Sequence, residues 1–157
     1  MASLKPKDKA PAFALQDRNG KTVRLSDFKG RKLLVYFYPK ADTPGCTKQA
    51  CSVRDASKAL TSLRVDALGI SPDEPDKLAR FDDKHGLGFP LLSDPDSKVA
   101  KAYGAWGEKS MYGKKYEGIL RSSFLVDEKG RILEAWYKVS PDDTVPKALK
   151  ALEAASA

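Results

Sequence analysis

The chain has 157 residues, of which 41% are hydrophobic and 31% charged, and its formal net charge is +7. This length predicts one domain, residues 1–157, with a core that needs no disulfide scaffold. Two cysteines are too few for such a scaffold, the first residues resemble no secretory signal, and the longest apolar run is too short to span a membrane. We expect a cytoplasmic protein, in which a close cysteine pair is more often catalytic or metal-binding than structural.

The positive charge is unevenly distributed along the chain. Residues 1–32 carry nine Lys or Arg against three Asp, whereas residues 66–96 carry three basic residues against eight acidic ones. Segregated charge of this kind can mark a nucleic-acid surface. The basic residues of the first segment are spread among turns and short strands, outside any recognised nucleic-acid module. A solvated face is therefore the favoured interpretation, and no nucleic-acid partner is expected.

The first thirty residues predict a β-hairpin followed by a helical turn. Pro11–Leu15 is a short extended piece and Lys21–Leu25 is the returning strand. Between them, Asn19-Gly20 suits the positive φ angles of a tight hairpin. Ser26–Gly30 then reads as a capped helical turn that ends at a glycine. The hairpin is an N-terminal extension that precedes the first strand–helix unit.

A central strand and a helix that carries both cysteines follow. Leu33–Tyr38 consists of six apolar or aromatic residues bounded by Pro39, which is typical of a short strand buried on both faces. After a loop over Asp42–Gly45, Cys46 stands at the head of a segment from Thr47 to about residue 63 that has helical composition. The sequence thus predicts a cysteine at the junction of a loop and a helix.

The remaining chain alternates strands and helices. The expected elements are a strand over Val65–Ile70, a helix from residues 71–75 to about His85, an edge-like strand over Phe89–Leu92, a helix over about Asp96–Tyr103, a long loop over Gly104–Gly118, strands over Leu120–Val126 and Ile132–Val139, and a last helix capped by Ser140, with Pro141 first and its end near Ala154. This order predicts an α/β fold with a mixed central sheet flanked by helices.

The position of Cys46 indicates a reactive thiol. Unpaired N–H groups and the positive end of the helix dipole meet at a helix start, which favours thiolate over thiol. A free cysteine is only about 3% ionised at pH 7, so complete ionisation gains no more than about 30-fold. Groups that align a substrate and stabilise charge must supply the rest. A free cysteine is usually a small buried hydrophobe, but a place after Pro44-Gly45 favours an exposed nucleophile.

The residues around both cysteines resemble a known family. Residues 39–46, PKADTPGC, fit the Pro-x-x-x-(Thr/Ser)-x-x-Cys signature of peroxiredoxins. Cys51 completes the Cys-x-x-x-x-Cys of the bacterioferritin-comigratory, or Q-type, branch. The resemblance continues in KAPAF, in FPLLSD over Phe89–Asp94, in Tyr112–Gly130 and in the closing helix, so it covers nearly the whole chain. It implies a thioredoxin-like fold and a thiol peroxidase activity.

The resemblance also implies a role for each site residue. Cys46 would attack the peroxide and become a sulfenic acid, and Cys51 would condense with it to an intramolecular disulfide. Arg121 would approach from a neighbouring strand, hold the thiolate ionised and bind the peroxide oxygens. The hydroxyl of Thr43 would face the thiolate and the ring of Pro39 would shield it. From the residues alone, Thr43 could equally cap the helix and Pro39 could simply end the strand.

The implied partners are a peroxide substrate and thioredoxin or a related dithiol reductant, with no metal, haem or flavin cofactor, no membrane contact and a monomeric chain. A metal site of both cysteines and His85, the only histidine, falls short of the four ligands of structural zinc. We therefore expect His85 to lie at a helix end. Four further residues are possible pocket neighbours but more plausible as packing residues: Tyr38, Gln49, Trp106 and Tyr116.

Two alternatives remain open from the sequence. The first is a thioredoxin-like dithiol oxidoreductase acting on protein disulfides, against which stands the Cys-x-x-x-x-Cys spacing in place of Cys-x-x-Cys. The second is a basic binding module without enzymatic activity, which salt-dependent retention on DNA would reveal.

Overall fold

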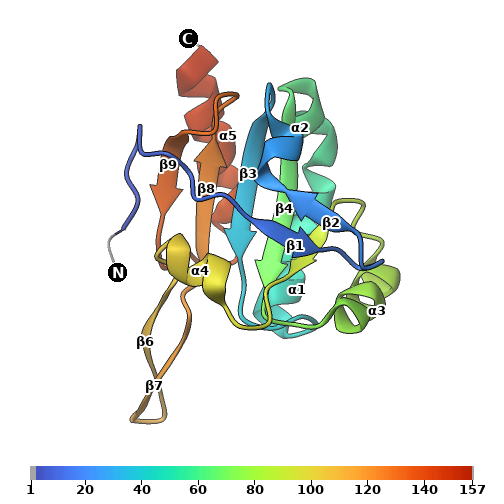
Figure 1. Ribbon diagram of the computed structural model, residues 1–157, viewed down its shortest axis with the longest axis vertical. Helices are drawn as coiled ribbons and strands as arrows, with labels where there is room; N and C mark the ends of the chain where they lie inside the picture. Colours follow the sequence, from blue (N-terminus) through green and yellow to red (C-terminus); the bar gives the residue numbers. More distant parts are fainter. Residues whose placement is uncertain (1–2, 157) are drawn as a thin grey trace.

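The computed structural model describes residues 3–156, and seven strands of this part form one sheet in the order β2-β1-β5-β4-β3-β8-β9 (Figure 1). Its strands are β1 (Ala14–Gln16), β2 (Thr22–Arg24), β3 (Lys32–Phe37), β4 (Val65–Ser71), β5 (Leu91–Ser93), β8 (Ser122–Val126) and β9 (Ile132–Trp136). Strand β3 pairs in parallel with β4 and antiparallel with β8. The prediction of a mixed central sheet is therefore confirmed.

The helices cover one face of this sheet more fully than the other. They are η1 (Leu25–Phe28, a 3-10 turn), α1 (Pro44–Asp55), α2 (Ser57–Ser62), α3 (Pro75–His85), α4 (Lys98–Ala102) and α5 (Thr144–Ser156). In Figure 1, α1, α2 and α5 lie behind the sheet, whereas β1 and β2 cross in front of it. None of the helices within residues 3–156 has the length and apolar character needed to cross a bilayer.

Strand β3 is buried on both faces, as its apolar run predicts. Successive side chains of a strand point to opposite faces. Leu33, Val35 and Phe37 belong to one core cluster, together with residues of the N-terminal segment and α4. Tyr36 belongs to a second cluster with residues of α1 and α3, and Leu34 to a third with residues of α2 and α5. Helix α1, which carries Cys46, therefore packs against the face of the sheet on which the Tyr36 side chain lies.

The N-terminal hairpin is confirmed, and its pairing with β5 makes β5 an inner strand of the sheet. Leu15 pairs with Val23 across the hairpin, and Gly20 adopts a positive φ of 78° in its turn. Gln16 then pairs with Ser93 of β5. The expectation that this strand lies at the sheet edge is wrong, because the docked hairpin covers its free side.

The cysteine helix is shorter than predicted. In place of one helix to residue 63, α1 ends at Asp55 and α2 begins at Ser57, with φ −90° and ψ 2° at Ala56 between them. Because of this break, the two helices pack in different core clusters. Val53 of α1 packs in the cluster of Tyr36, whereas Leu60 of α2 packs in the cluster around Leu34.

The last helix begins later than predicted. Residues 141–143 form a turn, in which the Asp142 N–H donates to the Ser140 hydroxyl over 3.2 Å. Helix α5 starts at Thr144, whose side chain is fully buried. The Ser140-Pro141 pair resembles a helix start, but the buried hydrogen bonds of Thr144 fix the observed one.

A second hairpin replaces the predicted long loop. Strands β6 (Trp106–Met111) and β7 (Lys114–Ile119) pair antiparallel and project from the body of the molecule (Figure 1). Their turn has positive φ at Tyr112 and Gly113, 53° and 79°. Most of β7 is exposed. A strand pair without a buried face needs no apolar alternation, so its sequence resembles a loop.

Candidate active site

Cys46 is the third residue of α1 and is buried, although the two helical residues before it are not. Pro44 takes the first helical position, where its missing N–H costs no hydrogen bond. The thiol side chain packs in the cluster of Tyr38 and Ala41, and Cys46 is only 1% exposed. The expectation of an exposed thiol is therefore wrong, because Cys46 forms part of the packing between α1 and the sheet.

The guanidinium of Arg121 lies directly against this thiol. Arg121 Nη2 is 3.4 Å from Cys46 Sγ, although the two residues are 75 positions apart in the chain. Arg121 stands between β7 and β8, and its carbonyl oxygen accepts a hydrogen bond of 2.8 Å from the Val139 N–H. The pairing of Cys46 with Arg121, which the sequence alone does not suggest, is present in the structure.

A chain of partly and fully buried hydrogen bonds fixes the orientation of Arg121. Arg121 Nη1 donates to Gln49 Oε1 over 2.6 Å, and Gln49 Nε2 donates to Thr144 Oγ1 over 2.7 Å. The Ser123 hydroxyl lies 3.4 Å from the same Thr144 oxygen. Gln49 is therefore more than the packing residue we expected. Its position one turn after Cys46 was a usable signal, whereas nothing local in the sequence marks Thr144 or Ser123.

Gly45 leaves room for the guanidinium. A Cβ at this position would lie 3.2 Å from Arg121 Nη2 and 3.4 Å from Pro141 Cγ. The contact with Arg121 is tighter than most Cβ contacts in proteins, whereas that with Pro141 is close to ordinary van der Waals distance, so a side chain here would push the guanidinium aside. The residue before Cys46 thus has a steric reason to be glycine.

The electrostatics of the site favour an anion. Within residues 3–156, Arg121 forms no ion pair with a carboxylate, and its closest partners are the Cys46 sulfur and an uncharged amide. Burial, followed by the positive charge of Arg121, lowers the pKa of Lys109, while Cys46 acts in the opposite direction. A cation without a carboxylate partner favours an anion in contact with it. The described part of the chain holds no cluster of three or more residues suited to a metal ion.

Thr43 and Pro39 occupy the loop that leads into α1. Thr43 is the N-cap residue, but its hydroxyl donates to the Lys40 carbonyl over 2.9 Å and makes no capping bond to the helix. Capping by this side chain is therefore wrong, and its role toward the thiolate stays a prediction. The Tyr38 N–H still pairs with the Ile70 carbonyl, and Pro39, which has no N–H, ends this pairing. Shielding by Pro39 stays a prediction.

Cys51 lies in the same unbroken helix as Cys46, and both are free thiols. Cys51 is half-buried, in contrast to the buried Cys46. Five residues of α-helix separate two Cα atoms by about 7.5 Å along the axis and turn their side chains about 140° apart. The two sulfurs therefore leave the helix on different faces.

The other expected neighbours have ordinary structural places. Tyr38 packs in the Cys46 cluster, as predicted. Trp106 lies under Lys101, whose Nζ is 4.7 Å from the ring centroid, and Tyr116 is 41% exposed on the projecting hairpin. His85 is the last residue of α3, as expected, with its Nε2 3.7 Å from a carboxylate oxygen of Asp42.

Comparison with known proteins agrees with this geometry. A family model described as the AhpC/TSA family matches residues 6–135. Peroxiredoxin Bcp of Escherichia coli K12 is 55% identical over 132 residues, which cover 84% of this chain and 85% of that protein. The chain belongs to the peroxiredoxin family.

Solved structures place this peroxiredoxin in the bacterioferritin-comigratory, or Q-type, branch. PrxQ of Xylella fastidiosa matches with a TM-score of 0.92 and 30% identity, covering 100% of both chains. The bacterioferritin comigratory protein of Xanthomonas campestris, described with an alkyl peroxide reduction activity, matches with a TM-score of 0.86 and 34% identity over 92% of both chains. The expected thioredoxin-like fold is confirmed by these likenesses.

Proposed function

We propose that this peroxiredoxin reduces hydrogen peroxide and organic hydroperoxides with Cys46 as the attacking thiolate. The observation that carries the proposal is the guanidinium of Arg121, 3.4 Å from the Cys46 sulfur and oriented by a hydrogen bond to Gln49. A planar, permanently charged donor at this place stabilises the thiolate and the charge that develops on the peroxide oxygens. The thiol peroxidase activity of the family follows from these two groups.

In the first step the Cys46 sulfur attacks the hydroxyl oxygen of the peroxide. A sulfur–oxygen bond forms as the oxygen–oxygen bond breaks, so the sulfur loses two electrons to the peroxide and becomes a sulfenic acid. The departing alkoxide or hydroxide takes a proton from solvent and leaves as alcohol or water. Arg121 stabilises this departing oxygen, Thr43 hydrogen-bonds to the peroxide or the sulfur, and Pro39 limits the access of water.

In the second step Cys51 resolves the sulfenic acid. Its thiolate attacks the Cys46 sulfur, a sulfur–sulfur bond forms, and hydroxide leaves as water after taking a proton. The half-buried position of Cys51 supports this role, because a resolving thiol must move to its partner. Both cysteines are free thiols in one helix, which corresponds to the reduced starting state of the cycle.

Thioredoxin or a related dithiol protein then reduces the disulfide by thiol–disulfide exchange. The cycle uses only thiols, peroxide and this external reductant, and it runs in a monomer that consists of one domain. A reducing cytoplasm supplies the dithiol. Support for this reductant comes from the family.

One experiment tests the proposed function directly. Fully reduced protein receives one equivalent of hydrogen peroxide and is quenched with denaturant and acid, which leave free thiols unmodified, before mass spectrometry. We expect a loss of two hydrogens and a crosslink between the peptides of Cys46 and Cys51. The Cys46→Ser variant is the matched control and should keep its mass. An unchanged mass in the unsubstituted protein would exclude the peroxidase and leave a disulfide oxidoreductase, which insulin reduction would detect.

A further inference from the structure

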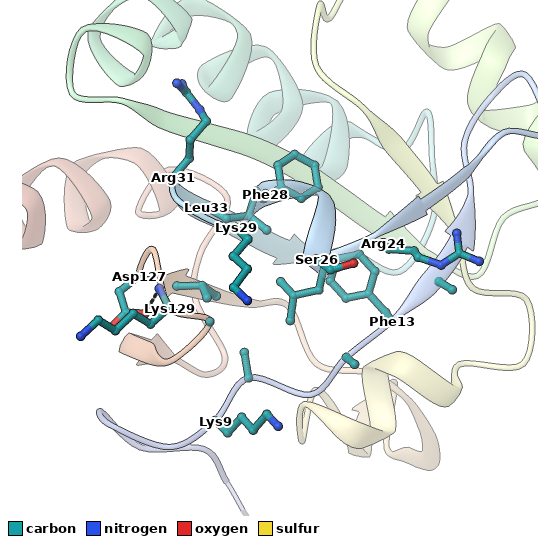
Figure 2. A pocket seen from close by; sticks show the side chains of 16 residues that line it. Lys9, Phe13, Arg24, Ser26, Phe28, Lys29, Arg31, Leu33, Asp127 and Lys129 are labelled. Atoms are coloured by element: carbon teal, nitrogen blue, oxygen red, sulfur yellow. Dashed lines mark hydrogen bonds between the residues drawn. The ribbon is translucent and has the colours of Figure 1, made fainter.

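The sheet face opposite Cys46 carries a cavity of about 550 Å³ (Figure 2). Three separate segments enclose it: residues 9–14, residues 24–31 and the turn at residues 126–130. Ligand pockets in proteins measure about 300 to 1,000 Å³. The cavity therefore has the size of a small-molecule site, and the proposed peroxidase chemistry does not use it.

Backbone hydrogen bonds join the three segments around this cavity. The Ala10 N–H donates to the Gly130 carbonyl over 2.9 Å, and the Gly30 N–H donates to the Glu128 carbonyl over 2.9 Å. The Leu25 N–H donates to the Phe13 carbonyl over 3.3 Å. Each wall is thus tied to a neighbour, so the cavity is a built feature of the fold and not a gap between unattached loops.

The floor of the cavity is apolar. Phe13, Leu33 and Val126 line it, and each is at least nine-tenths buried. Leu33 points to this face of the sheet, whereas its neighbour Leu34 belongs to a cluster on the face covered by helices. An occupant of the floor would therefore replace water by aliphatic and aromatic contacts, away from Cys46.

The rim of the cavity is cationic. Four exposed basic residues line it without forming an ion pair within residues 3–156: Lys9, Arg24, Lys29 and Lys129. In Figure 2 the Lys29 side chain extends into the space between Lys129 and Ser26. The one acidic lining residue, Asp127, already accepts hydrogen bonds from the N–H groups of Lys129 and Arg131.

We propose that this cavity binds an amphiphilic anion, an aliphatic chain that carries one acidic head group. The apolar floor takes the chain, and the unpaired lysines of the rim take the charge. A polyanion such as a nucleic acid fits less well, because it has no apolar part for the floor. Three of the four rim residues, Lys9, Arg24 and Lys29, belong to the excess of basic residues in the first 32 positions, so the site would account for part of that excess.

Three matched probes separate charge from apolar character. Decanoate, decan-1-ol and decyltrimethylammonium share a chain length and differ in head-group charge. Each is titrated into 15N-labelled reduced protein below its micelle-forming concentration. We expect saturable shifts from decanoate at the amides of Phe13, Phe28, Lys129 and Gly130, with none at Cys46. Decanol should bind more weakly, and decyltrimethylammonium should not shift these amides.

Substitution at the rim tests the charge. Lys29→Met keeps the apolar stem and removes the cation, and the double variant with Lys9→Gln removes a second one. An exposed ion pair contributes up to about 1 kcal/mol, so the single variant should bind decanoate roughly fivefold more weakly. Lys58→Gln, an exposed lysine on α2 that does not line the cavity, is the matched control and should bind as the unsubstituted protein does.

Four results would overturn the proposal. These are the absence of shifts, equal shifts from the anionic and cationic probes, unchanged affinity in the Lys29→Met variant, and shifts confined to the surroundings of Cys46. Shifts of the same amides that grow with protein concentration without any probe would assign the face to a second copy of the chain instead. Peroxide reduction is not a readout here, so failure of this site and failure of the proposed function are distinguishable.

Discussion

The two ends of α1 hold their cysteines in opposite ways. At the N-terminal end, Cys46 is 1% exposed and lies against Arg121, which Gln49 and Thr144 hold through a chain of hydrogen bonds. Further along, Cys51 is half-buried, and its thiol makes no hydrogen bond within the described residues. Elements far apart in the chain fix the first cysteine through hydrogen bonds, whereas the second is a half-buried residue of the helix without such a bond.

This difference separates two requirements of a two-cysteine enzyme. The attacking sulfur must stay aligned with the groups that stabilise charge, which favours a rigid, buried place. The resolving sulfur must travel, which favours a place with few contacts to break. The fold meets both requirements within one helix, so changes at the first end should affect chemistry and changes at the second should affect turnover.

Replacement of the two cysteines should produce the largest contrast. Cys46→Ser removes the attacking sulfur, and we expect it to abolish peroxide consumption. Cys51→Ser should still consume one equivalent and then stop as a sulfenic acid that thioredoxin cannot recycle efficiently. Single-turnover consumption with stoichiometric peroxide measures both. If Cys51→Ser consumed no peroxide in one turnover, the assignment of the two roles would be wrong.

Arg121→Lys tests whether the planar donor matters beyond its charge. A lysine keeps the charge but loses the two parallel N–H directions that meet Cys46 and Gln49. We expect peroxide reduction to slow about 100-fold while the ionised fraction of Cys46, followed by thiolate absorbance, changes far less. Arg80→Lys, an exposed site on α3, is the control. A rate loss explained wholly by fewer thiolates would contradict the positioning role.

Gln49→Glu tests the charge of the site with its shape preserved. A carboxylate against the guanidinium of Arg121 neutralises the cation that balances the Cys46 thiolate. Peroxide reduction should slow about tenfold at neutral pH, since the lost stabilisation is of the order of a charged hydrogen bond. Single-turnover consumption of stoichiometric peroxide measures this rate, and an unchanged rate would contradict a role for the charge beside Cys46.

Gly45→Ala should have the smallest effect on the rate of peroxide reduction. It should also show most clearly that this rate and the thermal stability change independently. The new Cβ would lie 3.2 Å from Arg121 Nη2, so the guanidinium must shift by a few tenths of an ångström. We expect about threefold slower peroxide reduction. Thermal stability should stay equal or rise slightly, because alanine favours helix over glycine. Reduced stability with an unchanged rate would place the strain elsewhere than at Arg121.

The sequence predicts the elements whose pattern arises from burial. Strand β3 and the N-terminal hairpin follow from an apolar run and an Asn-Gly turn. The β6–β7 hairpin cannot be predicted in this way because it has almost no buried face, so no apolar alternation marks it. The start of α5 differs from the predicted one because Ser140-Pro141 has the form of a helix start, whereas the tertiary contacts of Thr144 set the observed start.

Site residues were predictable to the extent that chemistry or resemblance marks them. The place of Cys46 at a helix start follows from local sequence. Only the family resemblance predicts Arg121, because a lone arginine before a strand has no local signal of a partner 75 positions away. Gln49 shares the buried side of α1 with Cys46 and Val53, and that spacing could have shown it. The burial of Cys46 itself depends on packing that no local pattern reveals.

The central claim is that α1 must unwind for the cycle to proceed. A disulfide usually requires Cα atoms within about 6.8 Å and converging side chains, whereas five residues of helix hold them about 7.5 Å apart along the axis and on different faces. Oxidation should therefore melt the helix between Cys46 and Cys51, and reduction should restore it.

Amide hydrogen exchange of the reduced and disulfide forms measures this directly. We expect protection from Thr47 to Val53 in the reduced form and its loss in the disulfide form, with unchanged protection in β3. Equal protection of Thr47 to Val53 in both forms would contradict the account.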